Sequence, residues 1–286
     1  MHGRHDMTRW ASLLLVSFTI TLATVRPTAG GAEVTRQVYI SALDSTGAPV
    51  TDLTATDIAV KEDGKERLVA SLQPATAPMH VVLLVEDGGL GTFQSGVAQF
   101  LQRSIGRGQF SITVLTPQAS QIVDFTDDVA SLKTAIGRLG VRGRVQTDGD
   151  QLIDAIAHAA KALRQRKAER PIILALTVAG GQPESVEPRD VLNTLRSSGA
   201  GLNVVFVTGA ELGMVLGDGP GQSGGRIEQA GTGAGIAPVM IKMADILQRQ
   251  YLLTYTLPDG VKPGERLSVS TSRKGITLTA PSRIAK

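Results

Sequence analysis

The sequence predicts an α/β protein with a doubly wound, mostly parallel sheet and a small antiparallel β module formed by the two flanks of the chain. Between residues 77 and 250, short apolar segments alternate with segments of helical periodicity. The apolar segments are continuous, which is typical of parallel strands buried on both faces. Residues 33–76 and 251–286 instead show alternating, strand-like patterns separated by turn residues.

The first 32 residues are predicted to be a signal peptide. Arg4 and Arg9 precede the apolar run Trp10–Val25, and small residues follow it. Cleavage is expected after Ala32, which would leave the protein in the periplasm or outside the cell. Retention of the segment as an N-terminal anchor is the alternative, and no other membrane contact is expected.

The N-terminal flank, residues 33–76, is expected to contain three strands. The stretch "VTRQVYISALD" alternates apolar and polar residues, which predicts a half-buried strand. Two further strands are expected around "EDGK", since the pair Asp63–Gly64 is a strong hairpin signal. The flank is expected to end in a linker, "QPATAP".

The middle of the chain, residues 77–250, is expected to form the α/β domain. The expected strands are Val81–Val85, Phe110–Leu115, Gln121–Phe125, Ile172–Thr177 and Asn203–Thr208. The expected helices are Thr92–Ile105, Val129–Leu139, Asp150–Arg166, Pro188–Ser198 and Pro238–Gln250. The stretch Gly217–Gly235 contains eight glycines in 19 residues, so a loop is expected there.

The C-terminal flank, residues 251–286, contains two strand-like stretches, "YLLTYTLPDG" and "RLSVSTSRKGITLTAP". The second is expected to be a hairpin that turns at Lys274–Gly275. Packing of this flank against residues 33–76 would make one antiparallel module, and two separate β flanks are the alternative.

Composition argues against several classes of function. The formal net charge is +3, and the first 32 residues carry three arginines against one aspartate, so the rest is near neutral. No basic stripe with interleaved aromatic residues is present, so nucleic-acid binding is not expected. The chain has no cysteine, and beyond the predicted signal peptide it has only His80 and His158, which excludes the usual zinc sites.

One motif is similar to that of a serine hydrolase but lacks its context. "GQSGG", Gly221–Gly225, matches the pattern G-x-S-x-G around Ser223. A nucleophile elbow needs a strand directly before it and a helix directly after it, whereas a glycine-rich loop is expected on both sides. In that fold class the base histidine follows the serine, and no histidine follows His158. The protein is therefore expected not to be an enzyme, with Ser223 as the only nameable nucleophile.

The stretch "VVLLVEDGGLGTFQ" has the pattern of a buried strand that ends in a binding loop. Glu86 and Asp87 follow five apolar residues and precede the glycines. Asp150 starts the periodic run of a helix, where an aspartate is a favourable N-cap. These three acids are the weak candidates for holding a metal ion.

Four stretches resemble the von Willebrand factor type A (VWFA, vWA) domain, and more narrowly the VWFA-related acidobacterial domain family of exported bacterial proteins. They are the strand-turn-strand block with "EDGK", then "HVVLLVEDGGL", "GDQLIDAIAHAAKAL" and "RIEQAG…ILQRQYLLTYTLPDG". The resemblance covers about residues 34–280. It implies the Rossmann-like vWA fold and a role in protein–protein interaction.

The resemblance also implies a position for a metal-ion-dependent adhesion site, which this sequence has changed. The family's Asp-x-Ser-x-Ser loop falls on Glu86, Gly88 and Leu90. The family's Thr falls on Asp150, with Thr147 as the alternative, and its last Asp falls on Val178. Three of the five ligands are absent and two are changed. Because Mg²⁺ requires near-ideal octahedral oxygen ligation, a degenerate site and no required cofactor are expected.

The expected function is an exported, non-enzymatic interaction or scaffold module that binds another protein without a metal. The first alternative is an adhesion module that depends on a divalent metal, with a rearranged site at Glu86, Asp87 and Asp150. The second alternative is a serine hydrolase that uses Ser223.

Removal of the signal peptide can be checked by fluorescence. Trp10 is the only tryptophan in the chain and lies in the predicted signal peptide. The protein purified from the exported fraction should therefore show tyrosine emission without tryptophan emission. Tryptophan emission from an intact chain in that fraction would instead indicate the retained anchor.

Overall fold

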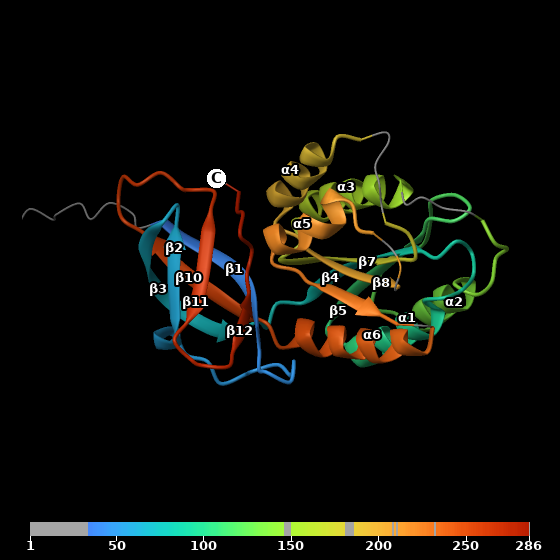
Figure 1. Cartoon of the computed structure of the whole chain (residues 1–286), viewed down its shortest axis with the longest axis horizontal. Helices are drawn as coiled ribbons and strands as arrows, with labels where there is room; N and C mark the ends of the chain where they lie inside the picture. The colour runs from blue at the N-terminus through green and yellow to red at the C-terminus, as the bar shows by residue number, and fades with distance from the viewer. Residues whose placement is uncertain are drawn as a thin grey trace, which may run out of the picture. The chain divides into compact units, whose positions relative to one another are not determined.

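The computed structural model describes residues 34–145, 150–180, 186–207, 209, 211–231 and 233–285. The predicted signal peptide and Thr147 lie outside these residues. The described chain forms two six-stranded sheets with helices around one of them (Figure 1). The mixed α/β class is therefore confirmed.

The first sheet is antiparallel and takes strands from both flanks of the chain, in the order β11-β2-β3-β10-β1-β12 (Figure 1). Its strands are β1 (Val34–Leu43), β2 (Ile58–Glu62), β3 (Lys65–Pro74), β10 (Tyr251–Leu257), β11 (Leu267–Thr271) and β12 (Thr277–Thr279). The hairpin expected at Asp63–Gly64 joins β2 to β3, and both of its turn residues have positive φ. The hairpin expected at Lys274–Gly275 was wrong, because β11 pairs with β2 and β12 pairs with β1 at the opposite end of the strand order.

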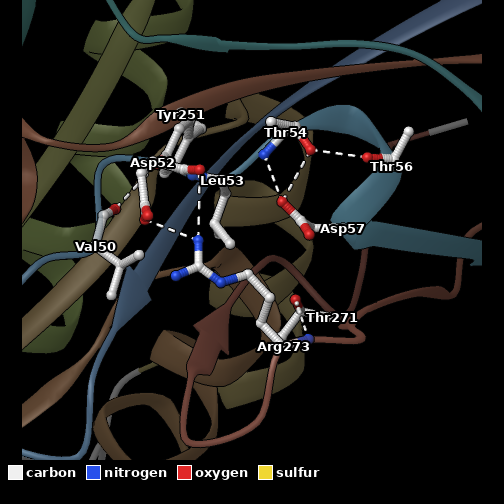
Figure 2. A network of polar contacts seen from close by, with 9 residues as sticks. All are labelled: Val50, Asp52, Leu53, Thr54, Thr56, Asp57, Tyr251, Thr271 and Arg273. Carbon is white, nitrogen blue, oxygen red and sulfur yellow. Dashed lines mark hydrogen bonds and ion pairs between the residues drawn. The ribbon is translucent and has the colours of Figure 1, made fainter.

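A polar network fixes the loop between β1 and β2 (Figure 2). The hydroxyl of Tyr251 accepts the N–H of Leu53 and donates to the carbonyl of Val50, each over 3.0 Å. Arg273 donates to a carboxylate oxygen of Asp52 over 2.8 Å, and this hydrogen bond holds the pKa of Asp52 below its usual value. Thus β10 and the segment after β11 both hold the loop, which ties the C-terminal flank to the N-terminal one.

The second sheet is mostly parallel and has the order β6-β5-β4-β7-β8-β9. Its strands are β4 (Met79–Glu86), β5 (Gly108–Val114), β6 (Ser120–Thr126), β7 (Arg170–Thr177), β8 (Gly201–Val207) and β9 (Ile227–Ala230). Only the pairing of β6 with β5 is antiparallel. All five expected strands of the middle region are present, and β4 lies in the centre between β5 and β7.

Helices cover both faces of the parallel sheet. They are α1 (Gln94–Ser104), α2 (Val129–Arg138), α3 (Asp150–Gln165), α4 (Pro188–Ser198), α5 (Met214–Ser223) and α6 (Gly233–Gln248). Figure 1 shows α3, α4 and α5 on one side, and α1, α2 and α6 on the other. Along β4, Val81, Leu83 and Val85 pack into the core on the α1 side, whereas Val82 and Leu84 pack into the core on the α3 side. This two-sided burial explains why the strand is apolar at every position.

Among the helices of the described residues, none is both long enough and apolar enough to cross a membrane.

The prediction of a loop over Gly217–Gly235 was wrong, because the first part of this stretch belongs to α5 and a later part forms β9. The glycines allow α5 to pack closely on the sheet. A Cβ atom at Gly219 would lie 2.8 Å from a methyl group of Leu202 on β8. Tertiary packing therefore overrides the low helix propensity of glycine.

A buried arginine joins the two sheets where the chain passes between them. Arg170, the first residue of β7, is only 3% exposed. Its guanidinium donates to the carbonyls of Ala75 (3.3 Å) and Leu247, and to the side-chain oxygen of Gln250 (3.0 Å). Ala75 follows β3, and Gln250 precedes β10. Burial lowers the pKa of Arg170 to about 10, so the side chain remains charged at neutral pH.

Replacement of Arg170 is expected to weaken the whole fold. Arg170→Met would leave several buried acceptors without a donor, and each such group costs about 1–3 kcal/mol. Urea unfolding should show that the free energy of unfolding decreases by an amount in this range or above it. The matched control is Arg107→Met, since Arg107 is exposed and should change the free energy of unfolding by less than about 0.5 kcal/mol. Equal effects of the two substitutions would contradict the role given to Arg170.

Candidate functional site

The end of β4 carries two acids into the protein interior. Glu86 is the last residue of β4, Asp87 follows it, and both side chains are buried. Because β4 is central in the sheet, neighbouring strands and loops enclose its end. Buried carboxylates are costly unless other groups compensate for their lost hydration, so their partners define the site.

A threonine on the neighbouring strand β7 forms a hydrogen bond with the side chain of Glu86. Thr177 ends β7 and is paired with Glu86 in the parallel ladder. Its hydroxyl donates to one carboxylate oxygen of Glu86 over 2.7 Å. The hydroxyl also accepts the N–H of Ala179 over 2.9 Å, which fixes its orientation. The ends of β4 and β7 are therefore joined through side chains as well as through the backbone.

Asp87 forms an ion pair with Arg142, which lies between α2 and α3. The Arg142 Nη2 atom is 2.7 Å from Oδ1 of Asp87, and the same oxygen accepts the N–H of Gly89 over 2.9 Å. The Arg142 side chain is 18% exposed, and its Nη1 atom donates to the carbonyls of Gly140 (2.9 Å) and Arg138 (3.3 Å). A largely buried guanidinium is therefore fixed against a fully buried carboxylate.

The segment that carries Arg142 covers the glycine loop directly. The N–H of Arg142 donates to the carbonyl of Gly89 (2.8 Å), and that of Val145 to the carbonyl of Gly88 (2.9 Å). Gly88, Gly89 and Gly91 all have positive φ, which glycine adopts at little cost. A Cβ atom at Gly89 would overlap the carbonyl oxygen of Gly143. The glycines thus allow two backbone segments to lie in contact.

Three polar atoms of this cluster are buried without a hydrogen-bond partner among the described residues. They are Oε1 of Glu86, Oδ2 of Asp87 and Nε of Arg142. Buried polar atoms are usually bonded, to protein or to ordered water. Such atoms could coordinate a small cation or bind a water molecule, so the donor set needs to be tested for a metal.

The described residues do not fit a divalent ion. Gly88 offers no side chain, Leu90 is apolar and 46% exposed, and Val178 is half-buried against the core on the α1 side. Asp150 begins α3, and its side chain lies outside what the structure describes. Within the described residues, no group of three or more His, Cys, Asp or Glu side chains could hold a metal. The guanidinium already bound to Asp87 would also repel a second cation.

Other hollows in the described chain lie away from this site. A groove of about 660 Å³ runs along α3, and its lining includes Asp154, His158 and Phe125. A cavity of about 440 Å³ lies where the two sheets meet, with Arg170 and Arg196 in its lining. Neither lining includes Glu86, Asp87 or Arg142, so the buried charges at the end of β4 face neither hollow.

Ser223 is the last residue of α5, rather than part of a loop. Its hydroxyl donates to the carbonyl of Gly219 over 2.7 Å and accepts the N–H of Leu202 over 2.9 Å. Both partners are backbone groups, so the hydroxyl connects the end of α5 to the start of β8. Among the described residues, no histidine forms a hydrogen bond with this hydroxyl, and a general base is what a nucleophilic serine requires.

Sequence reasoning identified neither Thr177 nor Arg142 as a residue of this site. The weaker signal was that of Arg142. This arginine lies in the irregular stretch "GVRGRV", which has neither helical nor strand periodicity. Arginines in such segments are usually solvated, and nothing local shows which acid one of them will meet. Two acids at the end of a buried strand indicate that a positive partner is needed. They do not indicate which residue supplies it.

The contact between the glycine loop and the Arg142 segment can be tested with a matched pair of substitutions. Gly64 and Gly89 both have positive φ, but a Cβ atom at Gly64 would meet nothing within 4 Å. Gly64→Ala should therefore cost only the backbone strain, about 1–2 kcal/mol. Gly89→Ala should cost about 1–3 kcal/mol more, because it also overlaps Gly143. Urea unfolding measures both, and equal losses would show that the segment does not cover the loop.

Three solved structures illustrate what the chain is similar to. A von Willebrand factor type A protein from Catenulispora acidiphila is 11% identical, with 90% of this chain and 75% of that chain covered and a TM-score of 0.47. The manganese-loaded TRAP protein of Plasmodium vivax is 10% identical over 73% of this chain and 95% of that chain, with a TM-score of 0.45. An aerotolerance-related membrane protein from Bacteroides fragilis is 11% identical over 60% of this chain and 98% of that chain, with a TM-score of 0.44.

The sequence matches no family model and no curated protein. The similar structures include von Willebrand factor type A domains, but at these identities and TM-scores they assign neither a family nor an activity to this chain.

Proposed function

We propose that this protein is an exported, non-enzymatic interaction module that binds another protein through the carboxyl edge of its parallel sheet. The observation that carries the proposal is the contrast between the buried and the exposed side chains at this edge. Its acids are buried and one is paired with Arg142, whereas apolar side chains are exposed on the two segments above them.

The exposed apolar residues come from adjoining segments. Leu90 of the glycine loop is 46% exposed, and Val141 and Val145 of the Arg142 segment are 80% and 40% exposed. The backbone bonds between Arg142 and Gly89 and between Val145 and Gly88 keep the two segments together. Apolar side chains brought together on a surface are typical of the central part of a protein–protein interface.

The proposed binding does not require a metal. Of the five positions that the resemblance to vWA domains implies, Gly88, Leu90 and Val178 supply no oxygen side chain. The alternative is a divalent-metal-dependent adhesion module with a rearranged site at Glu86, Asp87 and Asp150. Among the described residues, one carboxylate oxygen of Glu86 and one of Asp87 have no hydrogen-bond partner, and this observation favours the alternative.

We propose no catalytic role for Ser223. Its hydroxyl is bonded to the backbone at the end of α5, and a nucleophile needs both an exposed oxygen and an adjacent base. The serine-hydrolase hypothesis would require labelling by a fluorophosphonate probe that Ser223→Ala abolishes, and we expect no labelling.

The test is a binding measurement with surface variants. A partner is first isolated from the exported fraction on the immobilised protein, and its affinity is then measured with purified components. Val141→Asp places a charge in the apolar surface and should raise Kd by at least about ten-fold. Leu68→Asp is the control, because Leu68 is also exposed, at 70%, but lies on β3 of the other sheet.

Two outcomes would contradict the proposal. Equal affinities of Val141→Asp and Leu68→Asp would place the contact elsewhere on the protein. Loss of binding in a chelator, restored by Mg²⁺ or Mn²⁺ and absent in Glu86→Ala, would favour the metal-dependent alternative.

A further inference from the structure

The buried acids at the end of β4 create an electrostatic problem that the fold must solve. Glu86 and Asp87 are adjacent, and both are almost fully removed from solvent. Burial disfavours the charged form of each carboxylate, and a nearby cation relieves the cost. The source of that cation decides whether the loop depends on a dissolved ion.

Arg142 supplies the positive charge from within the chain. Its guanidinium is 2.7 Å from Asp87, and it is positioned by the carbonyls of Gly140 and Arg138. The backbone next to it is bonded to the loop that follows Asp87. The side chain is therefore held from several directions, unlike an exposed surface arginine that pairs transiently with a nearby acid.

We infer that Arg142 is a tethered cation that takes the place of a divalent metal ion at this edge of the sheet. It neutralises Asp87, and its segment closes over the glycine loop. A guanidinium cannot dissociate from the chain and stays charged at any physiological pH. The loop is therefore formed at every metal concentration, and the apolar surface above it does not depend on an ion.

This inference deepens the proposed function, since it concerns the same surface, but its test needs only the purified protein. A partner that fails to bind would leave the role of Arg142 untouched. Conversely, a failure of the tests below would leave open which surface a partner contacts.

The first experiment is a double-mutant cycle measured by urea unfolding. Arg142→Met leaves Asp87 buried without its cation and should raise the equilibrium constant for unfolding at least about ten-fold. Arg144→Met is the matched control, because Arg144 lies in the same segment but is exposed, and it should change this constant by about two-fold or less. Arg142→Lys should fall between them, because an ammonium group cannot reproduce the planar contacts.

The cycle is completed with Asp87→Asn and the double variant Asp87→Asn/Arg142→Met. In the Asp87→Asn background, loss of Arg142 should cost much less than in the wild type, because the carboxylate that needs the cation has gone. The double variant also keeps the test valid if Arg142→Met does not fold. Equal effects of Arg142→Met and Arg144→Met, or strictly additive effects in the cycle, would overturn the inference.

The second experiment tests whether a metal can replace the guanidinium. Thermal unfolding is followed with Mg²⁺, Mn²⁺ or Ca²⁺ alone added as the probe. The wild type, the double variant and Arg142→Met should all show no change in Tm, because the described side chains supply too few oxygen ligands for a divalent ion. A wild-type Tm that rises with metal and no longer does so in Asp87→Asn would overturn the inference.

Discussion

The junction between the two sheets depends on the buried charge of Arg170. A guanidinium without a paired carboxylate is stable in the interior only if neutral acceptors surround it. Here the acceptors are Gln250, the carbonyl of Ala75 and the carbonyl of Leu247 in the last turn of α6, where the helix dipole favours a cation. All three lie at or near the points where the chain passes between the sheets. Desolvation of Arg170 is therefore compensated only when both junctions are formed, which couples the antiparallel sheet to the parallel one.

At the opposite end of the parallel sheet the buried charges are negative, and they too must be compensated for their lost hydration. There β4 buries the carboxylates of Glu86 and Asp87, and Thr177 and Arg142 compensate for the lost hydration. An arginine takes part at both ends, as the buried charge at the junction and as the compensating group at Asp87, because its planar group can bond several oxygens at once. The difference lies in the consequence. Arg170 joins the sheets, whereas Arg142 brings an irregular segment over the glycine loop and leaves apolar side chains such as Val141 on the outside.

The glycine loop at the end of β4 therefore has a charged, buried interior and an apolar exterior. The turn through Gly88, Gly89 and Gly91 still follows a central strand and leads into α1. What reaches the surface is apolar rather than an array of oxygen ligands. We therefore propose recognition of a partner by shape and apolar contact, with Arg142 keeping the surface formed. A static, metal-free surface of this kind would respond to partner concentration and not to ionic conditions.

The sequence by itself determined the α/β order and the burial of β4 on both faces, because the period of apolar residues depends on local geometry and on which faces are buried. It also placed Glu86 and Asp87 at the end of that strand, and it revealed that Gly88, Leu90 and Val178 carry no metal-ligating side chain. It misplaced α5, because a glycine-rich segment has low helix propensity until close packing against Leu202 favours it. Tertiary structure alone decided that Arg142 meets Asp87 and that Arg170 meets Gln250. These pairs are 55 and 80 residues apart, and only the folded chain can determine which polar group compensates for the burial of a charge.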